Sequence, residues 1–539
     1  MKRINFFLGV ASLLSVSCSS NVTSTPETTD AVTLSSEATS YSNPVLAGDY
    51  ADPSVIRVGD DYWATATSSE WAPLFPLLHS KNLVDWETVG HVFPEQLPEW
   101  AEAHFWAPEI TYDNGRYYIY YTAKKKGGNL CVGVASANKP TGPYIDHGPL
   151  VCQELGSIDG YQIRDEQGDL YLIWKEDGNS RGLPTPIWGQ RMNEERTALL
   201  GEKFELFRND PGTWEGGLVE GAALVRRGDY YYAFYSGDAC CGRECTYGIG
   251  VARAKTLTGP WEKYENNPIM QKNEEWKCPG HGTLVTTPEG KDYFLYHAYS
   301  TDASVYAGRQ GLLDEVKWRE NGWPYFEGRS PDITSEAPTG SRANKATALN
   351  VEDEFNTSGL SQEWQWLLNK LPQYSIKSGN NGQLVLHASP DNIGSVVAQR
   401  TKSADYSATT AIDKNSLQNG TMAGLAAIGD NENAVGIAVT NGDIIIWTTK
   451  SNITTTIAKT AAPASTNLLR LKLSSENGEQ MQFAWSTDGK QWNTLQDADS
   501  VDASYLPPWD RGVRVGLTVK GPSAATATFD WFRITNDTE

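Results

Sequence analysis

Five side chains that can carry or accept a proton stand at similar places in this sequence. They are Asp52, Glu109, Asp159, Glu220 and His281, and each lies six to nine residues before a glycine of a recurring Gly-x-x-Tyr motif. Carboxyl groups held close together repel one another, which raises some pKa values and leaves other groups ionised. That separation is what paired general acid and general base roles require. The pattern therefore predicts a cluster for acid–base chemistry, provided that the fold brings the five positions together.

The repeat itself indicates how they meet. The motif glycines stand at 59, 115, 168, 228 and 290, and each Tyr opens an apolar, aromatic-rich run that is typical of a strand. A period of this length holds four short strands and their turns, which is one propeller blade. We therefore predict a five-bladed β-propeller over residues 43–330. The first strand of every blade lines the axis of such a fold, so the five residues would converge there.

The remainder of the chain also has the pattern of strands. Residues 331–349 are rich in Ser, Thr, Ala, Pro and Gly and are predicted to be a linker. Residues 350–539 contain apolar or alternating runs separated by turns such as Asn441-Gly442, which predicts a β-sandwich. The expected fold class is all-β, a five-bladed β-propeller followed by a β-sandwich domain.

The N-terminus has the features of an export signal. Lys2 and Arg3 precede an apolar run over residues 4–16 that is too short to span a bilayer. The run ends near Cys18 in a sequence similar to a lipoprotein processing site, with ordinary cleavage nearby as the alternative. We predict a signal peptide over 1–18 and a flexible tether over 19–42. The protein would be exported, either anchored through a lipid on Cys18 at the cell surface or in the periplasm, or secreted.

The net charge limits the classes of partner that the protein can bind, and the cysteine content indicates an oxidising compartment. The formal net charge of −21 repels a phosphate backbone, which argues against nucleic acid and favours a neutral substrate. Six cysteines remain besides Cys18, an even number that predicts disulfides in an exported protein. The pairing stays open, because Cys240 and Cys241 could bridge each other or pair separately with other cysteines.

The five axial segments resemble a known family. Together with Leu78-His79-Ser80-Lys81-Asn82-Leu83 and Gly308-Arg309-Gln310, they are similar to glycoside hydrolase family 43, five-bladed propeller enzymes that act on arabinose- and xylose-containing plant polysaccharides. By this resemblance, Asp52 is the general base that activates water and Glu220 the general acid. Asp159 would tune the pKa of the acid and orient the substrate. An inverting enzyme keeps its acid and base about 6.5 to 9.5 Å apart to leave room for that water.

The resemblance also implies the surroundings of these three carboxyls. Trp106, Arg309 and Glu109 would contact the substrate, although Glu109 replaces an Asp that is common at its place. His281 matches an axial histidine that lies beside a bound calcium or a water-filled channel in many members. No cofactor is expected for the reaction, and a structural calcium is a candidate at His281.

The resemblance does not settle the sugar. Tyr296-His297-Ala298-Tyr299 with Gly308-Arg309-Gln310 is similar to members that cleave arabinan and arabinofuranosides, whereas Asp353-Glu354-Phe355 resembles the sandwich appended to β-xylosidases. We expect an exported inverting α-L-arabinofuranosidase that acts on plant cell-wall polysaccharides, with β-xylosidase or arabinanase as the alternatives. The alternative from another class is a non-catalytic carbohydrate-binding propeller.

Overall fold

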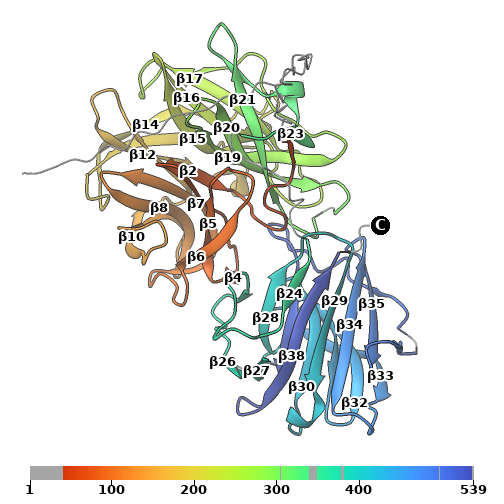
Figure 1. Ribbon diagram of the computed structural model, residues 1–539. Coiled ribbons are helices and arrows are strands. Elements are labelled where there is room, and N and C mark those ends of the chain that lie inside the picture. The colour runs from red at the N-terminus through yellow and green to blue at the C-terminus, as the bar shows by residue number, and fades with distance from the viewer. Residues whose placement is uncertain (1–39, 304, 339–348, 378–381, 497, 537–539) are drawn as a thin grey trace, which may run out of the picture. The chain divides into compact units, whose positions relative to one another are not determined.

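The computed structural model describes residues 40–303, 305–338, 349–377, 382–496 and 498–536 (Figure 1). This part of the chain is built almost entirely of strands, which confirms the predicted all-β class. Its short 3-10 helices are η1 (Asn179–Arg181), η2 (Glu327–Arg329) and η3 (Lys414–Ser416). The predicted signal peptide, nearly all of the predicted tether and most of the predicted linker lie outside the described residues.

Residues 54–325 form five four-stranded antiparallel sheets, the blades of the predicted propeller. Blades 1 and 2 contain β2 (Ser54–Val58), β3 (Asp61–Thr65), β5 (Leu74–Ser80) and β6 (Glu87–Phe93), then β7 (Ala101–Asp113), β8 (Arg116–Lys125), β9 (Leu130–Ala137) and β10 (Ile145–Val151). Blades 3 and 4 contain β11 (Ser157–Arg164), β12 (Leu170–Glu176), β13 (Ile187–Met192) and β14 (Leu199–Phe207), then β15 (Val219–Arg227), β16 (Tyr230–Gly237), β17 (Gly248–Ala254) and β18 (Glu262–Lys263). Blade 5 contains β19 (Trp276–Thr286), β20 (Asp292–Ser300), β21 (Gln310–Trp318) and β22 (Pro324–Tyr325).

Each blade is hydrogen-bonded to the next beside the axis, through a residue of the inner strand or just before it. A side chain from the preceding blade accepts the backbone N–H of the residue that begins the axial segment, so neighbouring blades hold each other in register. The five bonds run from Asp52 to His297 Nδ1 (3.0 Å), Ala107 to Thr67 Oγ1 (2.8 Å), Asp159 to Thr122 Oγ1 (3.1 Å), Val219 to Thr185 Oγ1 (2.8 Å) and His281 to Ser236 Oγ (2.8 Å).

At the same level, the backbone of every blade turns into the left-handed region. The residues are Asp52, Ala107, Asp159, Gly221 and His281, with φ angles of 49°, 42°, 57°, 60° and 41°. In blades 2 to 5 the pairing of the inner strand with its neighbour is irregular there. An irregularity of this kind re-aims a side chain out of the regular alternation of a strand. At Gly221 a Cβ would lie 2.8 Å from the His281 ring, so this position requires glycine.

The N-terminal end of the described chain joins the last blade. β1 (Ser40–Ser42) pairs with β23 (Thr334–Glu336), and the backbone of Leu46 exchanges hydrogen bonds with Gly311 in β21. The Asn43 side chain adds two bonds to the backbone of Leu313. These contacts close the ring between the first and the fifth blade.

Residues 351–535 form the predicted sandwich of two sheets. One holds β24 (Val351–Asp353), β26 (Tyr374–Lys377), β27 (Gln383–His387), β38 (Thr526–Thr535), β29 (Tyr406–Asp413), β34 (Leu468–Glu476), β35 (Gln480–Ser486) and β36 (Val501–Asp502). The other holds β28 (Ser395–Arg400), β37 (Arg514–Lys520), β30 (Met422–Ile428), β31 (Ala434–Val439), β32 (Asp443–Lys450) and β33 (Ile453–Ala461). Side chains of both sheets, such as Leu425, Ile437, Leu471 and Phe529, share one buried core. A short pair, β4 (Trp71–Ala72) with β25 (Trp366–Leu367), joins blade 1 to the start of this domain.

A buried carboxylate makes a second connection between the two domains. Asp49, just before blade 1, accepts hydrogen bonds from the backbone N–H groups of Arg309 (3.2 Å) and Gly512 (3.1 Å). It also forms an ion pair with Arg514, whose Nη2 lies 3.0 Å from the Asp49 carboxylate and whose side chain is 1% exposed. Burying such a pair is tolerable only while both partners are present.

The six cysteines expected to form disulfides do so. The bonds are Cys131–Cys152, Cys245–Cys278 and the bridge between neighbours Cys240 and Cys241. Of the two arrangements that the sequence left open, Cys240 and Cys241 therefore adopt the vicinal one. Within the described ranges, no helix has the length and apolar character needed to cross a membrane.

Candidate active site

A pocket of about 270 Å³ opens at the end of the propeller axis where the left-handed residues lie. It is lined by residues of all five blades and by two residues of the sandwich. Its lining includes the predicted site residues Asp52, Trp106, Asp159, Glu220, His281 and Arg309. The pocket therefore brings together four of the five residues that the repeat predicted to converge, and with them Trp106 and Arg309, which the resemblance suggested.

Asp52 is held as an ionised carboxylate. Arg309 Nη1 lies 2.8 Å from its Oδ1, and the Thr67 hydroxyl donates to its Oδ2 over 2.7 Å. Burial by itself would raise the pKa of Asp52, but the charge of Arg309 and the contacts with His281 and His297 hold it well below its ordinary value. A carboxylate that stays ionised can accept a proton from water.

Asp159 and Glu220 form an unequal pair of carboxyls. Burial, together with the charge of Glu220, raises the pKa of Asp159 to about 6, while one of its oxygens accepts the N–H of Gly221 over 2.9 Å. For Glu220 burial acts in the same direction, but the ammonium of Lys175 outweighs it and holds the pKa below its ordinary value. Of the two carboxyls, Asp159 is thus the one whose pKa is raised and Glu220 the one whose pKa is lowered, whereas a general acid at Glu220 requires the proton there.

Two of the three predicted substrate contacts line the same pocket. Trp106 presents its ring beside Trp509 of the sandwich, with centroids 5.9 Å apart in an edge-on arrangement. Arg309 bridges the domains, because it binds Asp52 and also donates from Nη2 to the backbone oxygen of Asp510 over 3.0 Å. Trp509 is 59% exposed although it is a large aromatic side chain. A flat aromatic surface at a pocket mouth suits the apolar face of a sugar ring.

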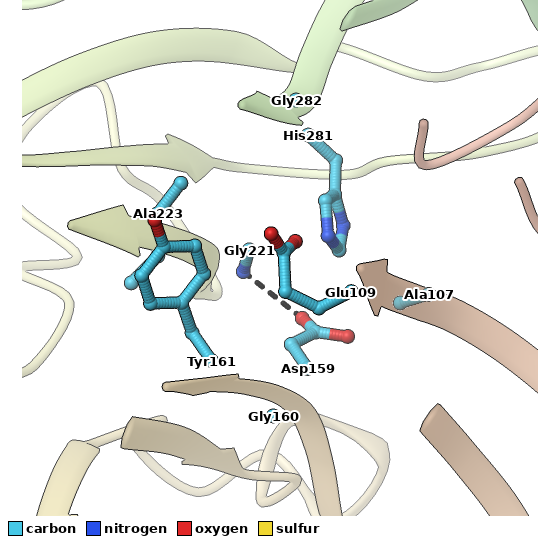
Figure 2. A pocket seen from close by; sticks show the side chains of 10 residues that line it. Ala107, Glu109, Asp159, Gly160, Tyr161, Gly221, Ala223, His281 and Gly282 are labelled. Atoms are coloured by element: carbon cyan, nitrogen blue, oxygen red, sulfur yellow. Dashed lines mark hydrogen bonds between the residues drawn. The ribbon is translucent and has the colours of Figure 1, made fainter. Parts of the chain in front are cut away.

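Glu109 lies near the propeller axis, as the repeat predicts, but outside the lining of the pocket that holds the other predicted site residues. It lines the narrow channel along the propeller axis together with Tyr161, His281 and the backbone of Gly221, as Figure 2 shows, and is not among the lining of the catalytic pocket. Burial raises the pKa of Glu109 to about 8. The physical reason is register: Ala107, not Glu109, occupies the left-handed position in blade 2, so Glu109 lies two residues further along the inner strand.

His281 lies between the channel and the pocket. Its Nδ1 is 3.5 Å from Asp52 Oδ1, and its ring covers Gly221. Among the residues that the structure describes, no group of three or more His, Cys, Asp or Glu side chains is arranged to hold a metal ion. The calcium at His281 stays a prediction.

Several pocket residues were not found by sequence reasoning. Lys175 and Tyr247 contact Glu220, and His297 contacts Asp52. Asn179, Ser180 and the vicinal disulfide Cys240–Cys241 also belong to the pocket lining. Lys175 and His297 come from second strands of their blades. The register count followed only the inner strands, so it could not include them.

These groups define a class of enzyme. An ionised carboxylate with an arginine partner, a second carboxyl pair that holds one proton, and aromatic rings at the rim are the parts of a glycoside hydrolase pocket. The five-bladed propeller is the scaffold that holds these groups together at one end of its axis.

Comparison with known proteins agrees with this class. The model of glycosyl hydrolases family 43 matches residues 41–324, and that of the beta xylosidase C-terminal Concanavalin A-like domain matches residues 352–535. The chain belongs to glycosyl hydrolase family 43.

Individual relatives cover nearly the whole chain. A xylosidase/arabinosidase 43B of Humicola insolens is 26% identical over 91% of this chain and 96% of its own length. A xylan 1,3-beta-xylosidase of a Vibrio species is 30% identical, but the match spans 56% of this chain and 60% of that protein. The crystal structure of a family 43 protein from Bacillus licheniformis, BlXynB, superposes with a TM-score of 0.77 at 27% identity, over 92% of this chain and all of that one.

Proposed function

We propose that this glycoside hydrolase is an exported, inverting α-L-arabinofuranosidase that removes terminal sugars from plant cell-wall polysaccharides. The observation that carries the proposal is the single small pocket that holds Asp52, Asp159 and Glu220 together. Its volume of about 270 Å³ lies just below the range of roughly 300–1,000 Å³ typical of sites for drug-sized ligands. A site of that size accepts one sugar unit at a time, which favours release from a chain end.

The roles follow from the charges. Asp52, kept ionised by Arg309, takes a proton from a water molecule, whose oxygen attacks the anomeric carbon. The bond to the leaving oxygen breaks on the opposite face of the sugar, and Glu220 delivers a proton to that oxygen. Glu220 takes up this proton when the substrate is bound, and the neighbouring carboxyl of Asp159 sets how readily it does so, because each charge raises the pKa of the other group. The incoming water is on the other side from the leaving group, so the configuration inverts.

Similarity to named relatives supports the choice of sugar. A non-reducing end alpha-L-arabinofuranosidase of Bacteroides ovatus is 24% identical over 91% of this chain and 94% of its own length. The second candidate is a β-xylosidase, favoured by the match of residues 352–535 to the beta xylosidase C-terminal domain.

A substrate panel tests the proposal. Purified protein is incubated with nitrophenyl α-L-arabinofuranoside, nitrophenyl β-D-xyloside and linear arabinan, and the released anomer is followed by NMR. We expect fastest turnover of the arabinofuranoside and first release of the inverted anomer. Preference for the xyloside would replace the first candidate by the second, and first release of the retained anomer would refute the proposed roles.

The same charges predict the pH dependence of kcat/KM. The active form needs Asp52 ionised and one proton on the Asp159–Glu220 pair. Because the pKa of Asp159 is about 6, that proton is lost as the pH rises through about 6, and activity falls on the alkaline side. Because the pKa of Asp52 is held low, activity persists down to at least about pH 4, the ordinary range of an aspartate. A profile that is still flat at about pH 9 would contradict this assignment.

The proposed export agrees with the three disulfides, which persist in oxidising compartments. The proposed lipid anchor rests on the sequence around Cys18 alone. Labelling of the expressed chain with radioactive palmitate, with Cys18→Ser as the control, tests it. Equal labelling of both chains, or of neither, would refute the anchor.

A further inference from the structure

Lys175 is a buried cation that none of the three catalytic roles accounts for. It stands near the end of β12, its side chain is 1% exposed, and it lines the catalytic pocket. Its Nζ donates to Glu220 Oε2 over 2.6 Å and to Asp177 Oδ1 over 2.9 Å. A buried ammonium is costly unless it is paired, and here it is paired twice.

Glu220 has a second hydrogen-bond donor and several charged neighbours. Besides Lys175, the hydroxyl of Tyr247, just before β17, donates to its Oε1 over 2.8 Å. The other titratable or charged groups that face it are Asp177 after β12, Asp159 on β11, His281 on β19 and, across the pocket, Asp52 with Arg309. Both oxygens of Glu220 thus accept hydrogen bonds, which favours its ionised form.

These contacts stabilise the ionised form of Glu220, which is the form after proton donation and not the form that donates. A glycosidic oxygen has lone pairs but no hydrogen, so a bound substrate favours a protonated Glu220 that donates to it. Lys175 can release its bond to Glu220 when Glu220 is protonated, because Asp177 keeps the ammonium paired. After the proton has moved to the leaving oxygen, which keeps the electron pair of the broken bond, Lys175 stabilises the carboxylate that remains.

We infer that Lys175 is a positioning residue for Glu220: its ammonium group, shared between Glu220 and Asp177, decides which carboxyl of the Asp159–Glu220 pair holds the proton and makes Glu220 a stronger acid during bond cleavage. The inference rests on the proposed function, since it takes Glu220 to be the proton donor. It adds a fourth charged group, and a fifth in Asp177, to the three carboxyls.

Lys175→Met tests it with two measurements on the full-length enzyme. Removing the cation raises the pKa of the pair, so the alkaline limb of kcat/KM moves to higher pH, by about 1 to 3 units for an adjacent opposite charge. Turnover of an alkyl glycoside, whose leaving group needs the proton, falls at least about 10-fold more than turnover of a dinitrophenyl glycoside, whose leaving group does not. A change in packing alone would lower both rates equally and leave the limb in place.

Companion variants keep the test decisive if Lys175→Met folds poorly. Asp177→Asn leaves Lys175 in place and removes the competing anion, so the alkaline limb moves to lower pH. Lys175→Arg keeps the charge and retains most of the wild-type profile. Lys263→Met is the control. It removes a similar ion pair outside the pocket lining, in which Lys263 Nζ lies 2.6 Å from Glu215 Oε2, and it should leave the alkaline limb of kcat/KM unchanged.

The outcomes separate the inference from the proposed function. If Glu220→Gln remains fully active, the proposed function fails. If Glu220→Gln loses activity while Lys175→Met and Asp177→Asn keep the wild-type alkaline limb and lose both substrates equally, the inference alone is overturned.

Discussion

Replacing Asp52 by Asn lowers kcat for a nitrophenyl arabinofuranoside by about 10²- to 10⁴-fold, the usual contribution of a general base. Asn keeps the volume of the side chain and one acceptor oxygen, which can replace the carboxylate oxygen that accepts from Arg309 (2.8 Å) or the one that accepts from Thr67 (2.7 Å), but not both. What it loses is the ability to take a proton from water. The loss should be nearly the same for good and poor leaving groups, because the need to activate water does not depend on which group departs.

The measurement compares kcat of Asp52→Asn and of a control, Asp61→Asn, with the wild type. Asp61 starts the second strand of the same blade and pairs at the surface with Lys81, 2.6 Å away, so its loss should leave kcat unchanged. Circular dichroism of each variant checks the fold. Full activity of Asp52→Asn would refute its role as base.

Replacing Glu220 by Gln gives a loss that depends on the leaving group. For an alkyl arabinofuranoside we expect a decrease of about 10²- to 10⁴-fold in kcat/KM, because an amide cannot protonate the departing oxygen. For a dinitrophenyl arabinofuranoside, whose leaving group is already a weak base, the decrease should be much smaller. The alkaline limb near pH 6 should also weaken with the good leaving group, since proton donation then no longer limits the rate.

A series of aryl and alkyl glycosides measures this dependence as the slope of log kcat/KM against the pKa of the leaving group. The slope should be steep in Glu220→Gln and shallow in the wild type. Glu176→Gln is a suitable control, because Glu176 lies on the same strand as Lys175 but contacts the ring nitrogen of Trp188 (2.8 Å) outside the pocket lining. Equal slopes in the wild type and in Glu220→Gln would remove Glu220 from the role of acid.

The architecture was accessible from the sequence because its signals are repeated. Five glycines at nearly constant spacing predicted five blades, and the structure has five four-stranded sheets. The convergence of Asp52, Asp159, Glu220 and His281 followed from the same period, since residues at equal places in equal blades meet at the axis. The pairing of Cys240 with Cys241 did not follow, because spacing alone left the alternatives open.

The position of Glu109, near the axis but outside the pocket lining, shows where counting along a strand fails. A count from the motif glycine assumes an unbroken strand, but the inner strands carry an irregularity that alters the count by a residue or two. A local signal was available. In Ala51-Asp52-Pro53 and Trp106-Ala107-Pro108 the two prolines match, and aligning them places Ala107, not Glu109, opposite Asp52.

Residues that act through another chain segment were beyond reach for a different reason. Lys175 acts through Glu220, and Trp509 reaches the pocket from the sandwich, so neither belongs to the periodic pattern of the inner strands. Their roles depend on distances between elements far apart in the sequence. Only three-dimensional coordinates supply those distances.

Asp49 connects Arg309, the partner of Asp52, to the second domain. One carboxylate holds the backbone of Arg309 on one side and Arg514 with Gly512 on the other. A chimera that grafts a foreign sandwich onto this propeller would leave an orphaned anion in the interior, at a cost of about 3–5 kcal/mol, and would loosen the residue that keeps Asp52 ionised. A propeller that carries Asp49 therefore needs a sandwich domain that supplies an arginine at the place of Arg514.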